Sequence, residues 1–290
     1  MKKNLLIILI LSFLKSSGQT GSEIYLFDLK VTDGGVVLSN GRNITTHKGY
    51  DNQPFFHPLQ PVIYYSSFDD SDRSDIKYYN YERKETKNLM QTHEREYSPT
   101  ITPDGQFISC IIQRDNGAQD LGKYPVTGGK PEILISHLKI GYHAWAGENK
   151  LLLFVLDDSI HNSLHYYDLS KNADTVIAEN IGRSLHKIPG QNAMSFVQKV
   201  SDKLSLIKRF DMNTGVISTI VATLPGQDHF TWLQNDMLLM SDGNKLFVSQ
   251  DKLDSKWQSV IIKGDTTMLK GVTRLATNSN NTKLAVVVSE

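Results

Sequence analysis

Short apolar segments and polar turns alternate along this chain, and the pattern recurs at a nearly constant spacing. Each unit opens with a short strand-like segment, turns at a Pro, Gly or Asn, and continues into a longer apolar segment. The equivalent positions in six successive units are Phe56, Ile101, Trp145, Ile188, Trp232 and Ala276. They follow one another at intervals of 45, 44, 43, 44 and 44 residues. Apolar segments of this length between turns predict antiparallel β-strands.

A second set of positions gives the same period. An aromatic residue precedes a polar turn and a further strand at Tyr79, Tyr124, Tyr167 and Phe210, at intervals of 45, 43 and 43 residues. We place Phe247 at this position in the fifth unit. Each unit therefore contains four short strands in about 44 residues, which is the period of a β-propeller blade.

The two ends of the chain complete one another. The sixth unit has only two strands, over residues 273–277 and 283–289, whereas residues 23–29 and 34–38 form two unmatched strands near the start. The sequence therefore predicts an all-β fold: a six-bladed β-propeller of four-stranded antiparallel blades over residues 22–290, with the last blade closed by the N-terminal strands. A β-sandwich or an open array is the alternative. Complementary ends favour the closed ring, because closure removes exposed strand edges.

Residues 1–18 have the layout of a secretory signal peptide. Lys2 and Lys3 precede an apolar run over residues 5–14, and small residues follow it. The run is too short to span a membrane comfortably, and an uncleaved anchor is the alternative. No other segment is apolar enough to cross a membrane. We therefore expect a soluble protein exported to a bacterial periplasm.

Composition narrows the class of partner. The chain has 31 Lys and Arg residues against 31 Asp and Glu residues, so its formal net charge is zero. A nucleic-acid binder normally shows a basic excess, so we expect no nucleic-acid partner. The single cysteine, Cys110, lies in an apolar strand and is expected to be buried and inert.

One repeat carries a family resemblance. The segment from Tyr97 to Gly105, YSPTITPDG, resembles the repeat signature of the TolB-type, WD40-like six-bladed propellers, and Gln53 to Pro58 is a weaker copy. The resemblance covers residues 22–290 and implies the propeller fold and a periplasmic address. TolB-type proteins carry an extra α/β domain ahead of the propeller, and we expect that domain to be absent here. Related propellers include hydrolase accessory domains, lactonases and lyases, so the fold alone does not define an activity.

The candidate site is the mouth of the central channel, where the segments that precede the inner strands converge. Ionisable and aromatic side chains gather in these segments: Asp51, Glu94, Glu96, Tyr142, His143, Arg183, His186, Asp228, His229 and Arg274. The arginines could clamp a carboxylate or a phosphate through their planar guanidinium groups. We therefore predict a ligand-binding site at this mouth.

Three of these residues suggest a metal. His143, His186 and His229 are spaced by 43 and 43 residues, so three successive blades would direct them toward one axis. With Glu96 or Asp228 they could hold a divalent metal, because neutral imidazole is a common metal ligand. The alternative is structural hydrogen bonding along the channel. The chain contains no Gly-x-Ser-x-Gly elbow and no phosphate-binding Gly-Lys-Ser/Thr loop.

Two functions are compatible with the sequence. The leading hypothesis is a non-catalytic binding or scaffold propeller of the cell envelope, a monomer that holds a protein, a peptide or a small anionic ligand at the channel mouth. The alternative is a metal-assisted hydrolase or lyase that acts on an acidic sugar or lactone, with Glu96 or Asp228 as base.

Overall fold

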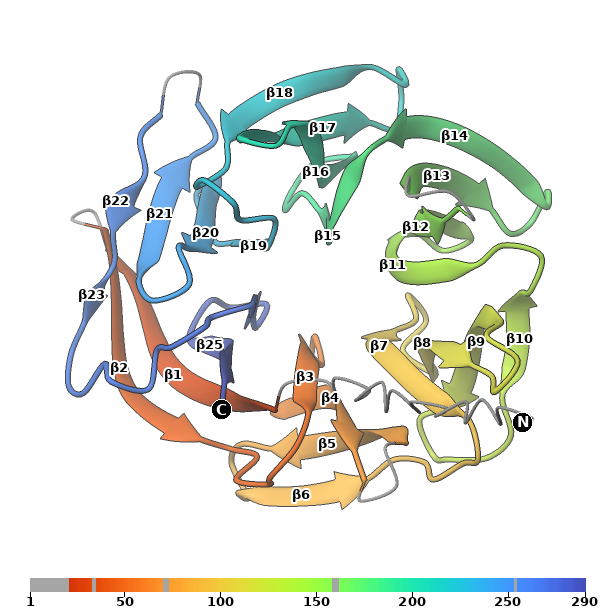
Figure 1. Cartoon of the computed structure of the whole chain (residues 1–290), viewed down its shortest axis with the longest axis horizontal. Coiled ribbons are helices and arrows are strands. Elements are labelled where there is room, and N and C mark those ends of the chain that lie inside the picture. The colour runs from red at the N-terminus through yellow and green to blue at the C-terminus, as the bar shows by residue number, and fades with distance from the viewer. Residues whose placement is uncertain (1–20, 33–34, 70–72, 158–161, 253–254) are drawn as a thin grey trace, which may run out of the picture.

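Six β-sheets surround a central channel in the computed structural model, which describes residues 21–32, 35–69, 73–157, 162–252 and 255–290 (Figure 1). Within these ranges the chain forms strands and turns and no helix. The sheets follow one another around the ring in chain order, which confirms the predicted six-bladed β-propeller. The predicted signal peptide at residues 1–18 lies outside the described residues.

The first three blades are continuous in sequence, and their strands run from the channel outward. Blade 1 consists of β3 (Asp51–Phe56), β4 (Val62–Phe68), β5 (Ser74–Asn80) and β6 (Glu85–Asn88). Blade 2 consists of β7 (Arg95–Ile101), β8 (Phe107–Gln113), β9 (Gln119–Pro125) and β10 (Glu132–Ile135). Blade 3 consists of β11 (Ile140–Gly147), β12 (Lys150–Leu156), β13 (Asn162–Asp168) and β14 (Ala173–Glu179).

The remaining blades complete the ring. Blade 4 consists of β15 (Ile181–Lys187), β16 (Ala193–Ser201), β17 (Leu204–Asp211) and β18 (Ile217–Ala222). Blade 5 consists of β19 (Phe230–Trp232), β20 (Met237–Ser241), β21 (Leu246–Gln250) and β22 (Gln258–Ser259). Blade 6 consists of β24 (Arg274–Thr277), β25 (Lys283–Ser289), β1 (Ser22–Thr32) and β2 (Gly35–Asn43).

The ring closes inside blade 6, as the sequence predicted. β1 pairs antiparallel with β25, from Ser22 opposite Ser289 to Asp28 opposite Lys283. The ammonium of Lys283 also forms an ion pair with the Asp28 carboxylate at the end of this ladder. The two ends of the propeller are therefore held by a continuous antiparallel ladder.

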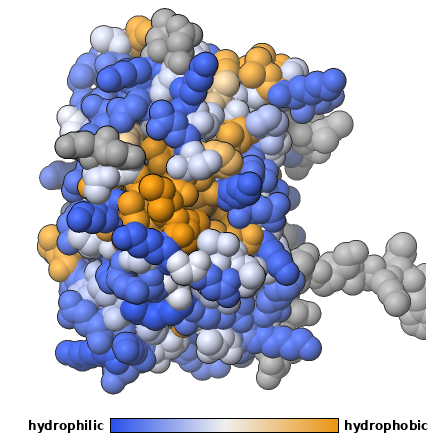
Figure 2. Space-filling view, turned by 90° about the vertical axis from the view of Figure 1, so that its left-hand side faces the viewer, coloured by the Kyte–Doolittle hydropathy of each residue, from blue (hydrophilic) through white to orange (hydrophobic). Residues whose placement is uncertain are grey.

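Blade 6 carries a fifth strand on its outer edge. The short β23 (Ile261–Ile262) lies parallel to β2, with Ile261 opposite Val37. Figure 2 shows that apolar side chains gather on this side of the molecule. Ile261 is exposed there, whereas Ile262 packs against the apolar core beneath.

The apolar core lies between blades rather than within one. The buried apolar residues of the described chain form six clusters, and each contains residues from two neighbouring blades. In β8, Ile108, Cys110 and Ile112 face blade 1, whereas Ile111 faces blade 3. Both faces of a second strand are thus buried, which explains its continuous apolar sequence. Cys110 is fully buried as expected, and burial raises the pKa of its thiol.

One positional prediction is wrong. Tyr79, Tyr124, Tyr167 and Phe210 do lie on equivalent third strands, opposite Ile63, Ile108, Leu151 and Met194. In blade 5 the equivalent residue, opposite Leu238, is Ser249 and not Phe247. The strands of this blade are short, and the apolar pattern alone did not fix their register.

Among the described residues, no helix is long and apolar enough to cross a membrane.

Candidate functional site

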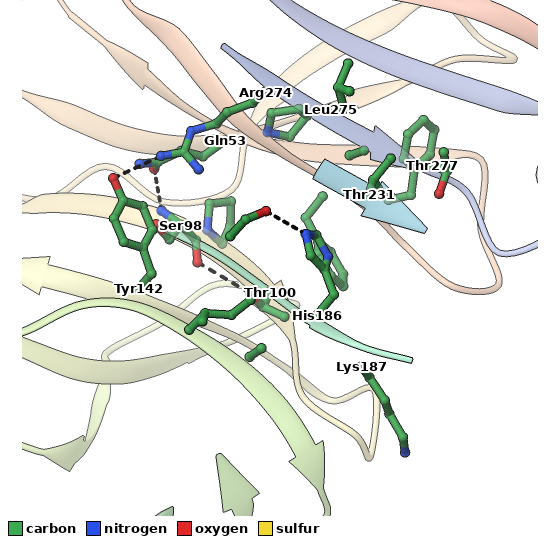
Figure 3. Close-up of a pocket in the computed structure, with 18 of the residues that line it drawn as sticks. Gln53, Ser98, Thr100, Tyr142, His186, Lys187, Thr231, Arg274, Leu275 and Thr277 are labelled. Atoms are coloured by element: carbon green, nitrogen blue, oxygen red, sulfur yellow. Dashed lines mark hydrogen bonds between the residues drawn. The ribbon is translucent and has the colours of Figure 1, made fainter. Parts of the chain in front are cut away.

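The inner strands of the six blades enclose a cavity of about 450 Å³, which we call the channel cavity (Figure 3). Every blade contributes to its wall. The lining residues include Gln53, Phe55, Ser98, Pro99, Tyr142, His143, Trp145, Arg183, Leu185, His186, Lys187, His229, Arg274, Leu275 and Ala276. The cavity extends beyond the mouth to the turns at the far ends of the inner strands, where Pro58 and Ser279 lie.

A second, smaller cavity of about 250 Å³ lies near the starts of the inner strands, and we call it the mouth cavity. It is lined by Tyr50, Gln53, Tyr97, Ile111, Gln113, Gln119, Gly141, Tyr142, Phe154, Leu156 and Arg183. Gln53, Tyr142 and Arg183 line both cavities. These three side chains therefore mark the boundary between the cavities.

A bridge crosses the channel at this boundary. Arg274 Nη2 on blade 6 donates a hydrogen bond to Tyr142 Oη on blade 3, at 2.9 Å. The Arg274 guanidinium also lies over the Tyr142 ring, 4.9 Å from its centroid, which is a cation–π geometry. In a six-bladed ring, blades 3 and 6 are opposite, so this contact spans the full width of the channel.

Backbone bulges shape the wall on blades 1 and 2. The pairing of β3 with β4 shifts register between Asn52 and Phe55, and that of β7 with β8 shifts between Tyr97 and Thr100. Gln53 and Ser98 sit at these two shifts with positive φ angles of 58° and 55°. Gln53 Oε1 accepts a hydrogen bond from the Ser98 N–H at 2.6 Å, which ties the two bulges together. Bulges redirect side chains at sites of this kind.

The charged side chains in the described lining of the channel are all basic. Arg183, Lys187 and Arg274 line the channel cavity, and none of its described lining residues is Asp or Glu. The mouth cavity likewise has Arg183 and no acidic residue among those that line it. A chain with a net charge of zero therefore presents a positive channel.

The channel histidines are neutral at physiological pH. Burial lowers the pKa of His143 to about 3 and the pKa of His186 to about 4. Burial and the nearby Arg274 and Arg183 hold the pKa of His229 well below its usual range. The positive charge of the channel at neutral pH thus comes from Lys and Arg.

The three histidines do not fit the metal site that their spacing suggested. Among the described residues, no three His, Cys, Asp or Glu side chains are arranged to hold a metal ion. His143 Nε2 lies 2.8 Å from Ser109 Oγ, and His186 Nε2 lies 2.9 Å from Ser184 Oγ. Each of these imidazoles is thus engaged with its own serine.

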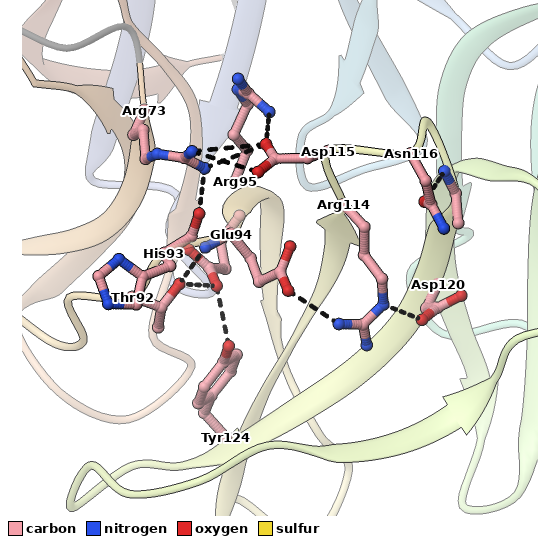
Figure 4. A network of polar contacts seen from close by, with 12 residues as sticks. Arg73, Thr92, His93, Glu94, Arg95, Arg114, Asp115, Asn116, Asp120 and Tyr124 are labelled. Carbon is pink, nitrogen blue, oxygen red and sulfur yellow. Dashed lines mark hydrogen bonds and ion pairs between the residues drawn. The ribbon is translucent and has the colours of Figure 1, made fainter.

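The predicted glutamates on blade 2 lie away from both cavities. Glu96 is fully buried, and its Oε1 accepts hydrogen bonds from Thr92 Oγ1 at 2.7 Å and Tyr124 Oη at 2.8 Å. Glu94 forms an ion pair with Arg114 at 3.0 Å (Figure 4). Successive residues of a strand point to opposite faces, so Tyr97 lines the mouth cavity whereas Glu96 faces the interior.

The two predicted aspartates also lie outside the cavity linings. Asp51 is buried, its carboxylate lies 3.7 Å from His47 Nδ1, and burial raises its pKa to about 6. Asp228 lies 3.6 Å from Lys199 Nζ and 3.4 Å from His229 Nε2. Of the predicted site residues, the structure therefore brings Tyr142, the three histidines and the two arginines together at the channel.

Several channel residues were not predicted, although they lie on the same inner strands as predicted residues. Gln53, Lys187 and Leu275 are examples. Two of the three tryptophans make an equivalent contact: Trp145 Nε1 donates to Ser109 Oγ at 2.9 Å, and Trp232 Nε1 donates to Ser195 Oγ at 2.8 Å. Each indole thus bonds to the second strand of the preceding blade, which supports a packing role between blades.

A Ser–His–Asp chain lies away from the channel on blade 3. Ser163 Oγ is 2.8 Å from His165 Nε2, and His165 Nδ1 is 2.8 Å from Asp174 Oδ1. None of these residues lines either cavity. Ser184 and His186, also two residues apart on one strand, make the same Ser–His contact. Side chains two residues apart share a strand face, so the Ser–His pairing is a local consequence of strand geometry.

Comparison with known proteins bears on the fold. No protein-family profile matches the sequence, and no curated protein sequence matches it. TolB from Acinetobacter baumannii superposes with a TM-score of 0.58 and 12% identity, over 93% of this chain and 64% of TolB. A protein assigned as TolB from Agrobacterium tumefaciens superposes with a TM-score of 0.68 and 13% identity, over 94% of this chain and 99% of that protein. The chain thus has a TolB-like propeller fold and spans less than two thirds of the Acinetobacter protein.

A propeller enzyme has a similar fold. An oligogalacturonate lyase in complex with manganese superposes with a TM-score of 0.56 and 13% identity, over 86% of this chain and 80% of the lyase. At this identity the likeness extends to the fold and not to the residues of a site.

Proposed function

We propose that this chain is an exported binding protein that holds a small anionic ligand in the central channel. The observation that carries the proposal is the charge of the wall: Arg183, Lys187 and Arg274 line the channel cavity without an acidic residue among its described lining. A concave wall of one sign attracts ligands of the opposite sign. Export and a periplasmic address rest on the signal-like sequence of residues 1–18.

A protein partner in the cell envelope fits the same charge. An acidic side chain or a chain terminus of a partner would present a carboxylate to these arginines, and Arg binds carboxylates in a bidentate manner. The rigid ring of blades is compatible with a monomer that presents this channel to a ligand or to a partner segment.

The geometry favours binding over the alternative of a hydrolase or lyase. Glu96 and Asp228, the bases that such an enzyme would use, do not line the channel cavity. The channel imidazoles are poor bases near neutral pH, because burial lowers the pKa of His143 to about 3 and the pKa of His186 to about 4.

A pair of dyes tests the proposal. Anilinonaphthalene sulfonate carries one negative charge, and phenylnaphthylamine offers nearly the same apolar body without it. We expect fluorescence titration to show that Arg183→Gln weakens the binding of the sulfonate by at least about tenfold, because a hydrogen bond to a charged group contributes about 1.5–3 kcal/mol. The neutral dye should bind equally to both forms.

Lys130→Gln is the matched control, since it makes the same charge change at an exposed residue between the outer strands β9 and β10. It should leave both dyes unaffected. Equal sulfonate affinity in wild type and Arg183→Gln, or equal losses in Arg183→Gln and Lys130→Gln, would overturn the proposal of an anion site in this channel.

A further inference from the structure

Several polar groups of the channel cavity form hydrogen bonds within the wall itself. Ser184 Oγ lies 2.9 Å from His186 Nε2 and 3.1 Å from the Phe230 carbonyl oxygen. Gln53 Oε1 accepts hydrogen bonds from Ser66 Oγ and from the Ser98 N–H, at 3.0 and 2.6 Å. A sugar or another ligand rich in hydroxyl groups needs several free donors and acceptors, since an unpaired buried polar group is costly.

The same holds at the far end of the cavity. Thr277 Oγ1 donates to the Trp232 carbonyl oxygen at 3.0 Å, and Ser279 Oγ donates to the Pro58 carbonyl oxygen at 2.8 Å. These side chains line the cavity, but their hydroxyl groups donate hydrogen bonds to the backbone of neighbouring blades. These two hydroxyl groups connect neighbouring blades, whereas Ser98 Oγ and His143 Nδ1 are buried in the lining without a hydrogen-bond partner among the described residues.

Apolar surface fills the space between these engaged groups. Apolar side chains from four different blades line the channel cavity: Phe55, Trp145, Leu185, Leu275 and Ala276. Such a wall is suited to the aliphatic or aromatic body of a ligand, because burial of apolar surface is favourable without directional contacts.

The two arginines differ in their readiness to bind an anion. Arg274 already donates to Tyr142 Oη and lies over the Tyr142 ring. Arg183 is exposed, lines both cavities, and has no ion pair or hydrogen bond from its guanidinium within the described part of the chain. Its full set of donors is therefore available for a carboxylate.

From these contacts we infer that the channel ligand is an amphipathic carboxylate, in which the carboxylate pairs with Arg183 and an aliphatic or aromatic body fills the channel cavity. The inference rests on the proposed function and adds the chemical class of the ligand to it. It places the head group where the channel and mouth cavities meet, beside the bridge from Arg274 to Tyr142. It also separates this site from one for acidic sugars, which would leave their hydroxyl groups unpaired against the apolar wall.

A series of straight-chain acids tests the inference in the wild-type protein. Butanoate, hexanoate, octanoate and galacturonate are titrated, below their aggregation concentrations, as competitors of anilinonaphthalene sulfonate. We expect affinity to rise about threefold to fourfold for each added methylene, which follows from the transfer free energy of a buried methylene. Galacturonate should compete no better than butanoate, and octanamide, which lacks the charge, should compete at least about tenfold more weakly than octanoate.

A variant of the apolar wall provides a second test of the inferred ligand class. Ala276 is partly buried and lines the channel cavity, so Ala276→Leu would occupy part of the space for the ligand body. We expect the variant to bind octanoate at least about fivefold more weakly, because overfilling a packed space is unfavourable, and to bind butanoate as the wild type does. This change in chain-length preference would not result from a general loss of stability.

The outcomes separate the inference from the proposed function. If all carboxylates compete through Arg183 but chain length has no effect, or galacturonate competes better than octanoate, the inference fails while the anion site stands. If no carboxylate competes and the sulfonate does not depend on Arg183, the proposed function fails as well.

Discussion

Leu26→Asp is expected to abolish the cooperative folding of the propeller. Leu26 lies on β1 with 1% of its surface exposed, and it packs in the core between blades 6 and 1. β1 is also the strand that closes the ring, since it pairs with β25 on one side and β2 on the other. A buried, unpaired carboxylate at this position should cost more than about 4 kcal/mol, which is a large part of the 5–15 kcal/mol typical of a domain.

Thermal unfolding followed by circular dichroism, together with size-exclusion chromatography, measures this effect. We expect no sigmoidal transition and an increased apparent size, because an open blade 6 exposes strand edges. Lys30→Glu is the control on the same strand: Lys30 is exposed, and the variant should change stability by no more than about 0.5 kcal/mol. A monomeric Leu26→Asp protein with an unchanged transition would show that β1 does not hold the ring closed.

Glu96→Gln is expected to stabilise the protein at alkaline pH and to have little effect under acid conditions. Burial raises the pKa of Glu96 to about 6, and the hydrogen bonds from Thr92 and Tyr124 only partly offset this cost. Because the pKa is higher in the folded than in the unfolded chain, Glu96 contributes stability that is fully present below its unfolded pKa and is lost as the pH rises through about 6. Gln stays neutral and can still accept both hydrogen bonds through its Oε1.

The expected gain at pH 8 is roughly 2 kcal/mol, since one unit of pKa corresponds to about 1.4 kcal/mol. Urea unfolding at pH 8 and at pH 4.5 measures it, and the gain should be close to zero at the lower pH. Glu94→Gln is the matched control on the adjacent loop, where the carboxylate is partly exposed and paired with Arg114. A gain at pH 4.5 as large as that at pH 8, or a loss of stability at pH 8, would contradict the assignment of Glu96 as a buried, unfavourably ionised carboxylate.

These predictions concern different parts of the molecule. Leu26 tests the closure of the ring, Glu96 tests the electrostatics of one blade, and Arg183 tests the channel. Arg183→Gln should leave unfolding nearly unchanged, because Arg183 is exposed and makes no hydrogen bond or ion pair through its guanidinium within the described residues. Stability and binding can therefore be assigned to separate residues.

The sequence by itself determined the architecture. The period of about 44 residues fixed the blades, and the two unmatched strands at each end indicated closure of the last blade. This was possible because each blade needs a second strand that is apolar on both faces, as the segment Ile108 to Ile112 shows, and such a strand is visible in sequence. The strand register of blade 5 was predicted wrongly from the same apolar pattern, since the strands of this blade are short.

Only the tertiary structure decided which side chains reach the channel. Glu96 and Arg183 occupy equivalent positions in the sequence repeat, yet Glu96 is buried and Arg183 lines the channel cavity. Side-chain direction reverses with each residue of a strand, and the register shifts of β7 and β15 against their neighbouring strands change that alternation by amounts that the sequence pattern does not show. The contact between Arg274 and Tyr142 joins residues 132 positions apart, and only the closed ring brings them together.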